Sequence, residues 1–110
     1  MIALVEQKKQ ELADICRRYR VERIDLFGSA ATGRFNPQSS DLDFVVCFAD
    51  RQPTGDYADR YLGLADSLER LFQCRVDLVT EQSIHNPYLR REIEATRQLI
   101  YEQQREEAAV

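Results

Sequence analysis

The sequence predicts an α/β fold of the mixed α+β type, in which flanking helices cover a small mixed sheet. Some segments carry apolar residues at helical spacing, and other, shorter segments alternate apolar with polar residues. The two kinds of segment follow one another along the chain in the order α-β-α-β-α-β-α. No repeat, linker or low-complexity tract divides them, so we expect residues 1–110 to form a single domain.

The first helix and the first strand are expected at residues 3–19 and 21–28. Helical spacing relates the apolar side chains of the first segment, which are Val5, Leu12, Ile15, Cys16 and Tyr19. The second segment carries Ile24, Leu26 and Phe27, and Gly28 ends it. Residues 30–32 suit a short helical turn, which Gly33 and the Asn36-Pro37 pair break.

The second strand is expected at residues 40–48, where alternation is clearest. One face carries Leu42, Phe44, Val46 and Phe48, and the other carries Asp41, Asp43, Val45 and Cys47. A helix at residues 56–72 follows, with an apolar stripe of Tyr61, Leu64, Ala65, Leu68, Leu71 and Phe72. The third strand, residues 75–79, again places an aspartate opposite its apolar side.

The last helix is expected to begin at Asn86-Pro87, because Asn caps helices well and Pro suits the first helical position. We expect it to reach about Gln104. Its inward side chains would be Leu89, Ile93, Thr96, Leu99 and Ile100.

The overall composition excludes several classes of protein. A net charge of −4 argues against a broad nucleic-acid surface, so we expect no direct nucleic-acid binding. No apolar run approaches the roughly 18 to 20 residues of a membrane span, and the N-terminus has no secretory signal, so we expect a cytoplasmic protein. The cysteines and the single histidine lack the spacing of a zinc site.

Acidic residues on the strands give the first indication of function. Asp41 and Asp43 stand two apart, so their carboxylates leave one face of the strand roughly 7 Å apart at the backbone. Two like charges held so close repel each other, and Asp is a poor strand former, so a divalent cation between them would explain the pair. Asp77, in RVDLV, meets the same condition on the next strand. Each acid alone is commonly a solvent-exposed surface residue, but together they suit two Mg²⁺ or Mn²⁺ ions and displacement at phosphorus.

The stretch GSAATGRF, residues 28–35, has the glycine spacing of a P-loop but cannot be one, because Phe35 stands where a metal-binding hydroxyl is needed. It can instead form a phosphate cradle that begins at Gly28 and Ser29. Gly28 allows close backbone approach, Ser29 adds a hydroxyl donor, and the amides at the start of the short helix attract anions. Arg34 adds a positive charge beside the turn.

These residues resemble the DNA polymerase β-like nucleotidyltransferase superfamily, whose signature is Gly-Ser, then Asp-x-Asp, then a third strand-borne acid. The resemblance runs from about Ile24 to Thr80, and the short chain is similar to the minimal nucleotidyltransferases, or MNTs. It implies the nucleotidyltransferase fold, and transfer of a nucleoside monophosphate from a triphosphate to a hydroxyl, with ATP as substrate and two Mg²⁺ ions as cofactors.

The resemblance also implies a role for each matching residue. Asp41 and Asp43 would bind both metals, and Asp77 would bind the catalytic metal and help to deprotonate the attacking hydroxyl. Gly28 and Ser29 would contact the triphosphate. The catalytic and metal-binding residues would therefore be the three aspartates.

Many minimal members are similar to antitoxins that silence a HEPN-type ribonuclease toxin by adenylylating it. The leading hypothesis is therefore an Mg²⁺-dependent antitoxin that transfers AMP to a hydroxyl of a HEPN-type partner. Family members often carry Arg directly after Gly-Ser, where this chain has Ala30, and Arg34 would replace only part of that charge. Two alternatives remain: a non-catalytic module that inhibits its partner by occlusion, and a nucleotidyltransferase acting on RNA or a small molecule.

Overall fold

The structure, a computed structural model, describes residues 3–32, 41–49 and 57–103. Within them a four-stranded sheet has the strand order β3-β2-β1-β4. Its strands are β1 (Val21–Phe27), β2 (Leu42–Phe48), β3 (Val76–Thr80) and β4 (Gln98–Glu102). β1 is antiparallel to β2 and to β4, whereas β2 and β3 run parallel, so the sheet is mixed as the sequence predicts.

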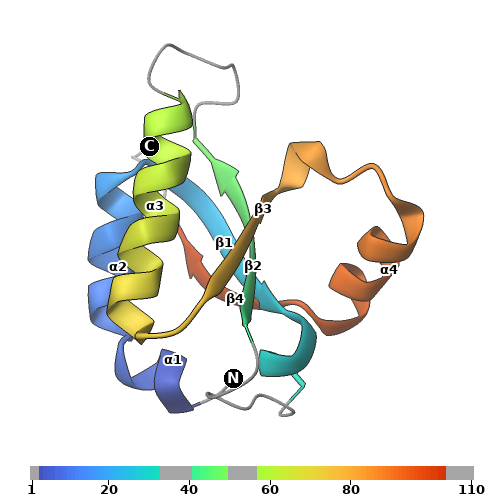
Figure 1. Cartoon of the computed structure of the whole chain (residues 1–110), viewed down its shortest axis with the longest axis horizontal. Coiled ribbons are helices and arrows are strands. Elements are labelled where there is room, and N and C mark those ends of the chain that lie inside the picture. Colours follow the sequence, from blue (N-terminus) through green and yellow to red (C-terminus); the bar gives the residue numbers. More distant parts are fainter. Residues whose placement is uncertain (1–2, 33–40, 50–56, 104–110) are drawn as a thin grey trace, which may run out of the picture.

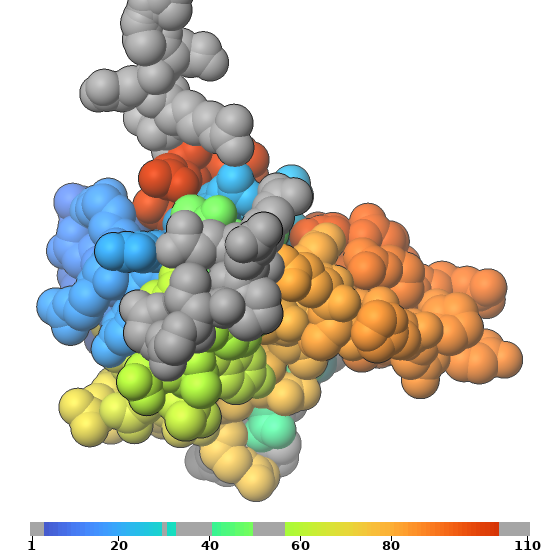
Figure 2. Space-filling model, turned by 90° about the horizontal axis from the view of Figure 1, so that it is seen from above, coloured from blue at the N-terminus to red at the C-terminus, as the bar shows by residue number. Residues whose placement is uncertain are grey.

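Helices lie on both sides of this sheet (Figure 1). They are α1 (Ala3–Gln7), α2 (Lys9–Arg18), α3 (Tyr57–Phe72) and α4 (Pro87–Thr96), with short 3₁₀ turns η1 (Gly28–Ala30) and η2 (Glu81–Ser83). α2 and α3 cover one face, and α4 lies on the other side, where it extends outward from the body (Figures 1 and 2). The predicted mixed fold class is confirmed.

The main hydrophobic core lies between the sheet and the α2–α3 layer. The strand residues buried there include Ile24, Leu26, Leu42, Phe44 and Val46, and α3 contributes Leu64 and Leu68. A smaller cluster on the opposite face joins Phe27 and Val45 to Ile84 and Ile93. This second cluster fixes α4 above the sheet face that carries the aspartates.

The helices differ from prediction at the N-terminus. The single helix expected at residues 3–19 is divided at Lys8, which adopts a turn conformation between α1 and α2. Nothing in the sequence marks this break. α3 agrees with the prediction for the residues that the structure describes, and it buries Leu64, Leu68 and Phe72 as expected.

The C-terminal prediction was wrong beyond Thr96. Asn86 does cap α4, because its side-chain oxygen accepts the amides of Tyr88 and Leu89 at 2.8 and 3.4 Å. The helix nevertheless ends at Thr96, and Gln98–Glu102 form β4 along the free edge of β1. Leu99, expected to point inward, is 43% exposed. Pairing with β1 satisfies the backbone of this segment and overrides its helical periodicity.

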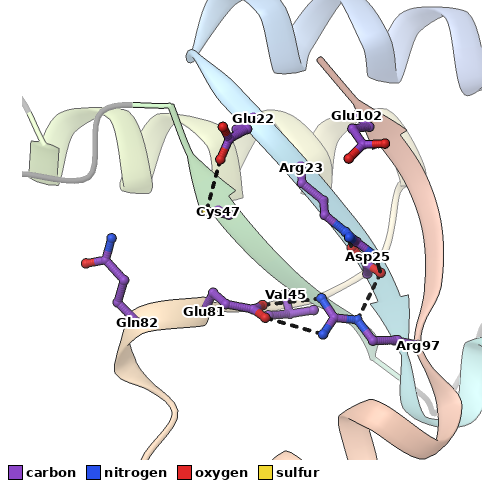
Figure 3. Close-up of a pocket in the computed structure, with 9 residues that line it drawn as sticks. All are labelled: Glu22, Arg23, Asp25, Val45, Cys47, Glu81, Gln82, Arg97 and Glu102. Atoms are coloured by element: carbon purple, nitrogen blue, oxygen red, sulfur yellow. Dashed lines mark hydrogen bonds and ion pairs between the residues drawn. The ribbon is translucent and has the colours of Figure 1, made fainter. Parts of the chain in front are cut away.

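A charged network joins the end of α4 to the middle of β1. Asp25 is only 1% exposed, yet it accepts hydrogen bonds from Arg23 at 2.8 Å and from Arg97 at 3.0 Å (Figure 3). Burial alone would raise the pKa of Asp25, but these hydrogen bonds outweigh it and hold the pKa below its ordinary value. Arg97 also contacts Glu81 of η2 at 3.3 Å. The network therefore holds β1, η2 and the α4–β4 junction together.

No helix in residues 3–32, 41–49 and 57–103 is both long enough and apolar enough to cross a membrane.

Replacing Arg97 tests this network. Arg97→Ala removes one of the two arginines that hydrogen-bond to the buried Asp25 and leaves Arg23, so we expect a loss of about 2 to 4 kcal/mol in the free energy of unfolding. Arg90→Ala is the matched control, because Arg90 contacts the same Glu81 from a side chain that is 40% exposed. It should cost less than about 1 kcal/mol. Equal losses in urea titrations of the two variants would show that the Asp25 contact does not stabilise the fold.

Candidate active site

The parallel pairing of β2 and β3 brings two predicted site residues side by side. Asp43 is in direct register with Asp77, and both lie on the sheet face opposite α2 and α3. Asp43 is half-buried, whereas Asp77 is exposed on the outer strand. Asp41 precedes the first residue of β2 and contacts Arg75 at 3.4 Å. The structure thus places the predicted acids at one end of the β2–β3 pair.

Crowding of these carboxylates is visible in their electrostatics. Burial, and then the negative charges of Asp77, Asp41 and Glu92, raise the pKa of Asp43 from 3.8 to about 6. Each of these causes disfavours the ionised carboxylate. Glu92 comes from α4, and sequence reasoning missed it because only the docking of that helix brings it near the strands. Without a bound cation, the ionised form of Asp43 is therefore destabilised.

Gly28 joins the predicted phosphate loop to Asp43. Its φ of +76° lies in the left-handed region, which glycine adopts without strain. A Cβ at this position would lie 2.7 Å from Oδ2 of Asp43, closer than a real Cβ can approach an oxygen. The backbone conformation therefore favours glycine here, and any side chain would also displace the carboxylate of Asp43.

The turn after Gly28 differs in detail from the predicted cradle. The expected short helix at residues 30–32 is the 3₁₀ turn η1, which begins at Gly28 and is too short for a helix dipole to contribute much. The Gly28 amide donates to Oγ1 of Thr96 at 3.0 Å, so it is already bonded within the protein. Ser29 is half-buried on the same turn. Arg34 lies outside the described residues.

The donor set fits a hard divalent cation in its chemistry. Mg²⁺ and Mn²⁺ prefer carboxylate oxygens, and Asp43 and Asp77 in register supply them from a rigid pair of strands. In residues 3–32, 41–49 and 57–103, however, no three acidic, histidine or cysteine side chains are already gathered closely enough to hold an ion together. Asp41 instead pairs with Arg75, a contact that it would exchange for a metal ion.

The matched family agrees with this geometry. Residues 9–100 match the family model described as a nucleotidyltransferase domain. The chain belongs to this family. The match covers both the Gly28–Ser29 turn and all three predicted aspartates, so the acids in register lie within a nucleotidyltransferase domain.

Individual relatives support the same assignment. A protein of Methanocaldococcus jannaschii, named as a candidate protein adenylyltransferase, is 39% identical over 91 residues, which cover 83% of this chain and 85% of the relative. A structure of a candidate minimal nucleotidyltransferase is 29% identical with a TM-score of 0.63, over 88% of this chain and 95% of that one. A mutant toxin–antitoxin complex is 26% identical with a TM-score of 0.64, over 87% of this chain and 73% of that one.

A separate pocket of about 470 Å³ lies farther along the same sheet face of this nucleotidyltransferase (Figure 3). The Asp25 network forms part of its wall, and Glu22, Cys47 and Glu102 line the remainder. The cluster of Phe27, Val45, Ile84 and Ile93 lies on this face too, with Val45 in the pocket wall and Phe27 paired with Asp43. None of the three predicted aspartates lines this pocket, so we assign the candidate active site to the aspartate end of the sheet.

The pH dependence of stability tests the crowding at Asp43. The carboxyl of Asp43 binds its proton more tightly in the folded state than in the unfolded chain. It therefore stabilises the fold below about pH 4, and this contribution is lost as the pH rises through about 6. The free energy of unfolding should change by on the order of 2 kcal/mol over this range, or several degrees in melting temperature. Asp43→Asn should therefore melt higher than wild type at pH 7 in EDTA and show a flatter pH profile.

Asp59→Asn is the matched control, since Asp59 is exposed in the first turn of α3. It should reproduce the wild-type pH profile. If Asp43→Asn reproduced it as well, the carboxylates would not be in electrostatic conflict.

Proposed function

We propose that this nucleotidyltransferase transfers AMP from ATP to a hydroxyl of a partner protein, with Mg²⁺ as its cofactor. The observation that carries the proposal is the register of Asp43 with Asp77 beside Gly28, within a matched nucleotidyltransferase domain. Residues 1–110 would act as one minimal nucleotidyltransferase domain, and we expect it to work in the cytoplasm.

The aspartates would hold the metal ions. Asp41 and Asp43 would contribute to both ions, and Asp77 would contribute to the catalytic ion. Bound Mg²⁺, or Mn²⁺ in its place, would neutralise the triphosphate and stabilise charge that develops on its oxygens. Burial and repulsion raise the pKa of Asp43, and a bound cation would offset that repulsion, so these carboxylates favour a cation.

The Gly28–Ser29 turn would contact the outer phosphates. Since the amide of Gly28 already donates to Thr96, the contribution of Gly28 is its missing side chain, which lets a phosphate approach next to Asp43. Ser29 would supply a hydroxyl donor. Arg34, outside the described residues, would supply positive charge.

The reaction is a displacement at the α-phosphorus. The acceptor hydroxyl oxygen forms a bond to the α-phosphorus while the bond from that phosphorus to the oxygen bridging to the β-phosphorus breaks, and pyrophosphate leaves. The hydroxyl proton passes to a base, for which Asp77 is the candidate because it is exposed on the outer strand. The Gly28–Ser29 turn would hold the leaving pyrophosphate on the β1 side of the site.

Two relatives favour a protein as the acceptor. The 39% identical archaeal relative carries the name of a protein adenylyltransferase, and the 26% identical structure is a toxin–antitoxin complex. Together with the resemblance to minimal nucleotidyltransferases, they support a HEPN-type toxin as partner and an antitoxin role for this chain. The net charge of −4 adds no support for RNA as the acceptor.

One feature favours a second function, inhibition by binding alone. Ala30 stands where related proteins often carry Arg, so a positive charge that would hold the triphosphate is missing from the turn. A chain that binds its partner and covers the toxin's active site would need neither the metal ions nor ATP. The two functions make opposite predictions for variants of the aspartates.

Labelling with ATP that carries a radioactive α-phosphate separates these functions. Wild-type protein, Mg²⁺ and a lysate of the source cells should transfer label to one small protein. A protein carrying both Asp41→Asn and Asp43→Asn should transfer less than about one hundredth as much, because it lacks both shared metal ligands. Asp59→Asn, an exposed aspartate far from the motif in sequence, should label as wild type does.

Each other outcome has a definite meaning. Label on RNA or a small molecule would keep the nucleotidyl transfer and contradict the protein acceptor. Absence of transfer, with a partner that co-purifies equally with wild type and the double variant, would support inhibition by binding alone.

A further inference from the structure

The hydroxyl of Thr96 links α4 to the turn that follows β1. Its oxygen accepts the amide of Gly28 at 3.0 Å and donates to the carbonyl of Glu92 at 2.8 Å. A threonine hydroxyl has one proton to donate, so donation to Glu92 leaves the oxygen lone pairs for Gly28. The contact joins residues 68 positions apart in the sequence, and it comes from the last residue of α4.

The Gly28 amide needs this acceptor. Gly28 is buried at the end of β1, and its amide donates to Thr96 and not to a neighbouring strand. A buried N–H group without an acceptor is costly, so removing the hydroxyl would favour another conformation of the turn. The carboxylate of Asp43 lies beside this turn, since a Cβ on Gly28 would be 2.7 Å from its Oδ2.

Thr96 is itself held firmly in place. The next residue, Arg97, hydrogen-bonds to Asp25 in the middle of β1 and contacts Glu81 of η2. Ile93, one turn earlier, is completely buried against the sheet. The end of α4 is thus anchored to the sheet on both sides of Thr96, and its hydroxyl offers Gly28 a fixed acceptor.

We propose that Thr96 is a positioning residue that holds the Gly28–Ser29 turn in the conformation that receives the phosphates of the nucleotide. This inference rests on the proposed nucleotidyl transfer. Thr96 acts through Gly28 and does not itself contact the reacting atoms. The required chemistry is a hydroxyl acceptor, so serine can replace threonine, whereas valine has nearly the same shape but cannot accept the amide.

The test measures binding of an ATP analogue with a methylene group between its α- and β-phosphorus atoms, in the presence of Mg²⁺, by calorimetry on the full chain. Thr96→Val should raise the Kd about tenfold, because only part of the population then holds the turn in the competent conformation. Thr96→Ser should stay within about twofold of wild type. In transfer assays, the KM for ATP should rise in Thr96→Val while kcat at saturating ATP changes much less.

A second readout does not depend on activity. Hydrogen exchange at the Gly28 amide, followed by NMR, should be at least about tenfold faster in Thr96→Val than in Thr96→Ser, since the amide loses its acceptor. Ser67→Ala is the matched control for loss of a half-buried hydroxyl, because Ser67 donates to the hydroxyl of Tyr19 on the opposite side of the sheet. It should change neither the Kd nor the exchange rate of Gly28.

The outcomes separate the inference from the function beneath it. If wild type binds the analogue and Thr96→Val binds it equally well, Thr96 has no positioning role. If wild type fails to bind it, both the proposed transfer and this inference are overturned. Should Thr96→Val melt below the assay temperature, Thr96→Ala replaces it with the same expected rise in Kd, and an unchanged Kd in that variant refutes the inference.

Discussion

The parallel pairing of β2 with β3 is the constraint on which the rest of the site depends. It places Asp43 opposite Asp77, and burial, together with the resulting repulsion, raises the pKa of Asp43. A parallel pair requires a crossover connection, and α3 covers the sheet between these strands. The hydrophobic core under α3 therefore forces together two carboxylates that would separate if they were free. The fold thus tolerates an unfavourable pair of charges, and this pair forms a site that favours a divalent cation.

The sheet face that carries the aspartates, on the side of α4, shows how the chain fixes the surroundings of those carboxylates. Gly28 approaches Asp43 without a side chain, Thr96 accepts the amide of Gly28, and Arg97 anchors the end of α4 to Asp25. The last two of these contacts are part-buried hydrogen bonds between elements distant in sequence. Polar contacts of this kind fix position more than they add stability, since their desolvation offsets much of their attraction. The proposed site must hold a triphosphate close to aspartates that repel it, so the Gly28–Ser29 turn needs a fixed position.

The sequence was sufficient to predict the local features and insufficient for the long-range ones. Alternation in β2 identified both the buried face and the aspartates on the other face, because a strand repeats every two residues. The helical periodicity of α3 was equally clear. β4 was missed because residues 98–102 also fit a helical stripe, and only pairing with the free edge of β1 decides between the two. No local pattern predicted the roles of Glu92, Thr96 and Arg97 at the site, since these roles arise only when α4 docks onto the sheet.

The most direct test of the account is the position of a bound metal ion. Crystals grown with Mn²⁺ and the methylene analogue of ATP would reveal the ion by its anomalous scattering. The account predicts a peak within about 2.5 Å of carboxylate oxygens of both Asp43 and Asp77, with the triphosphate beside Gly28 and Ser29. A peak in the acidic pocket lined by Glu22 and Glu102, with no ion between the strand aspartates, would contradict it.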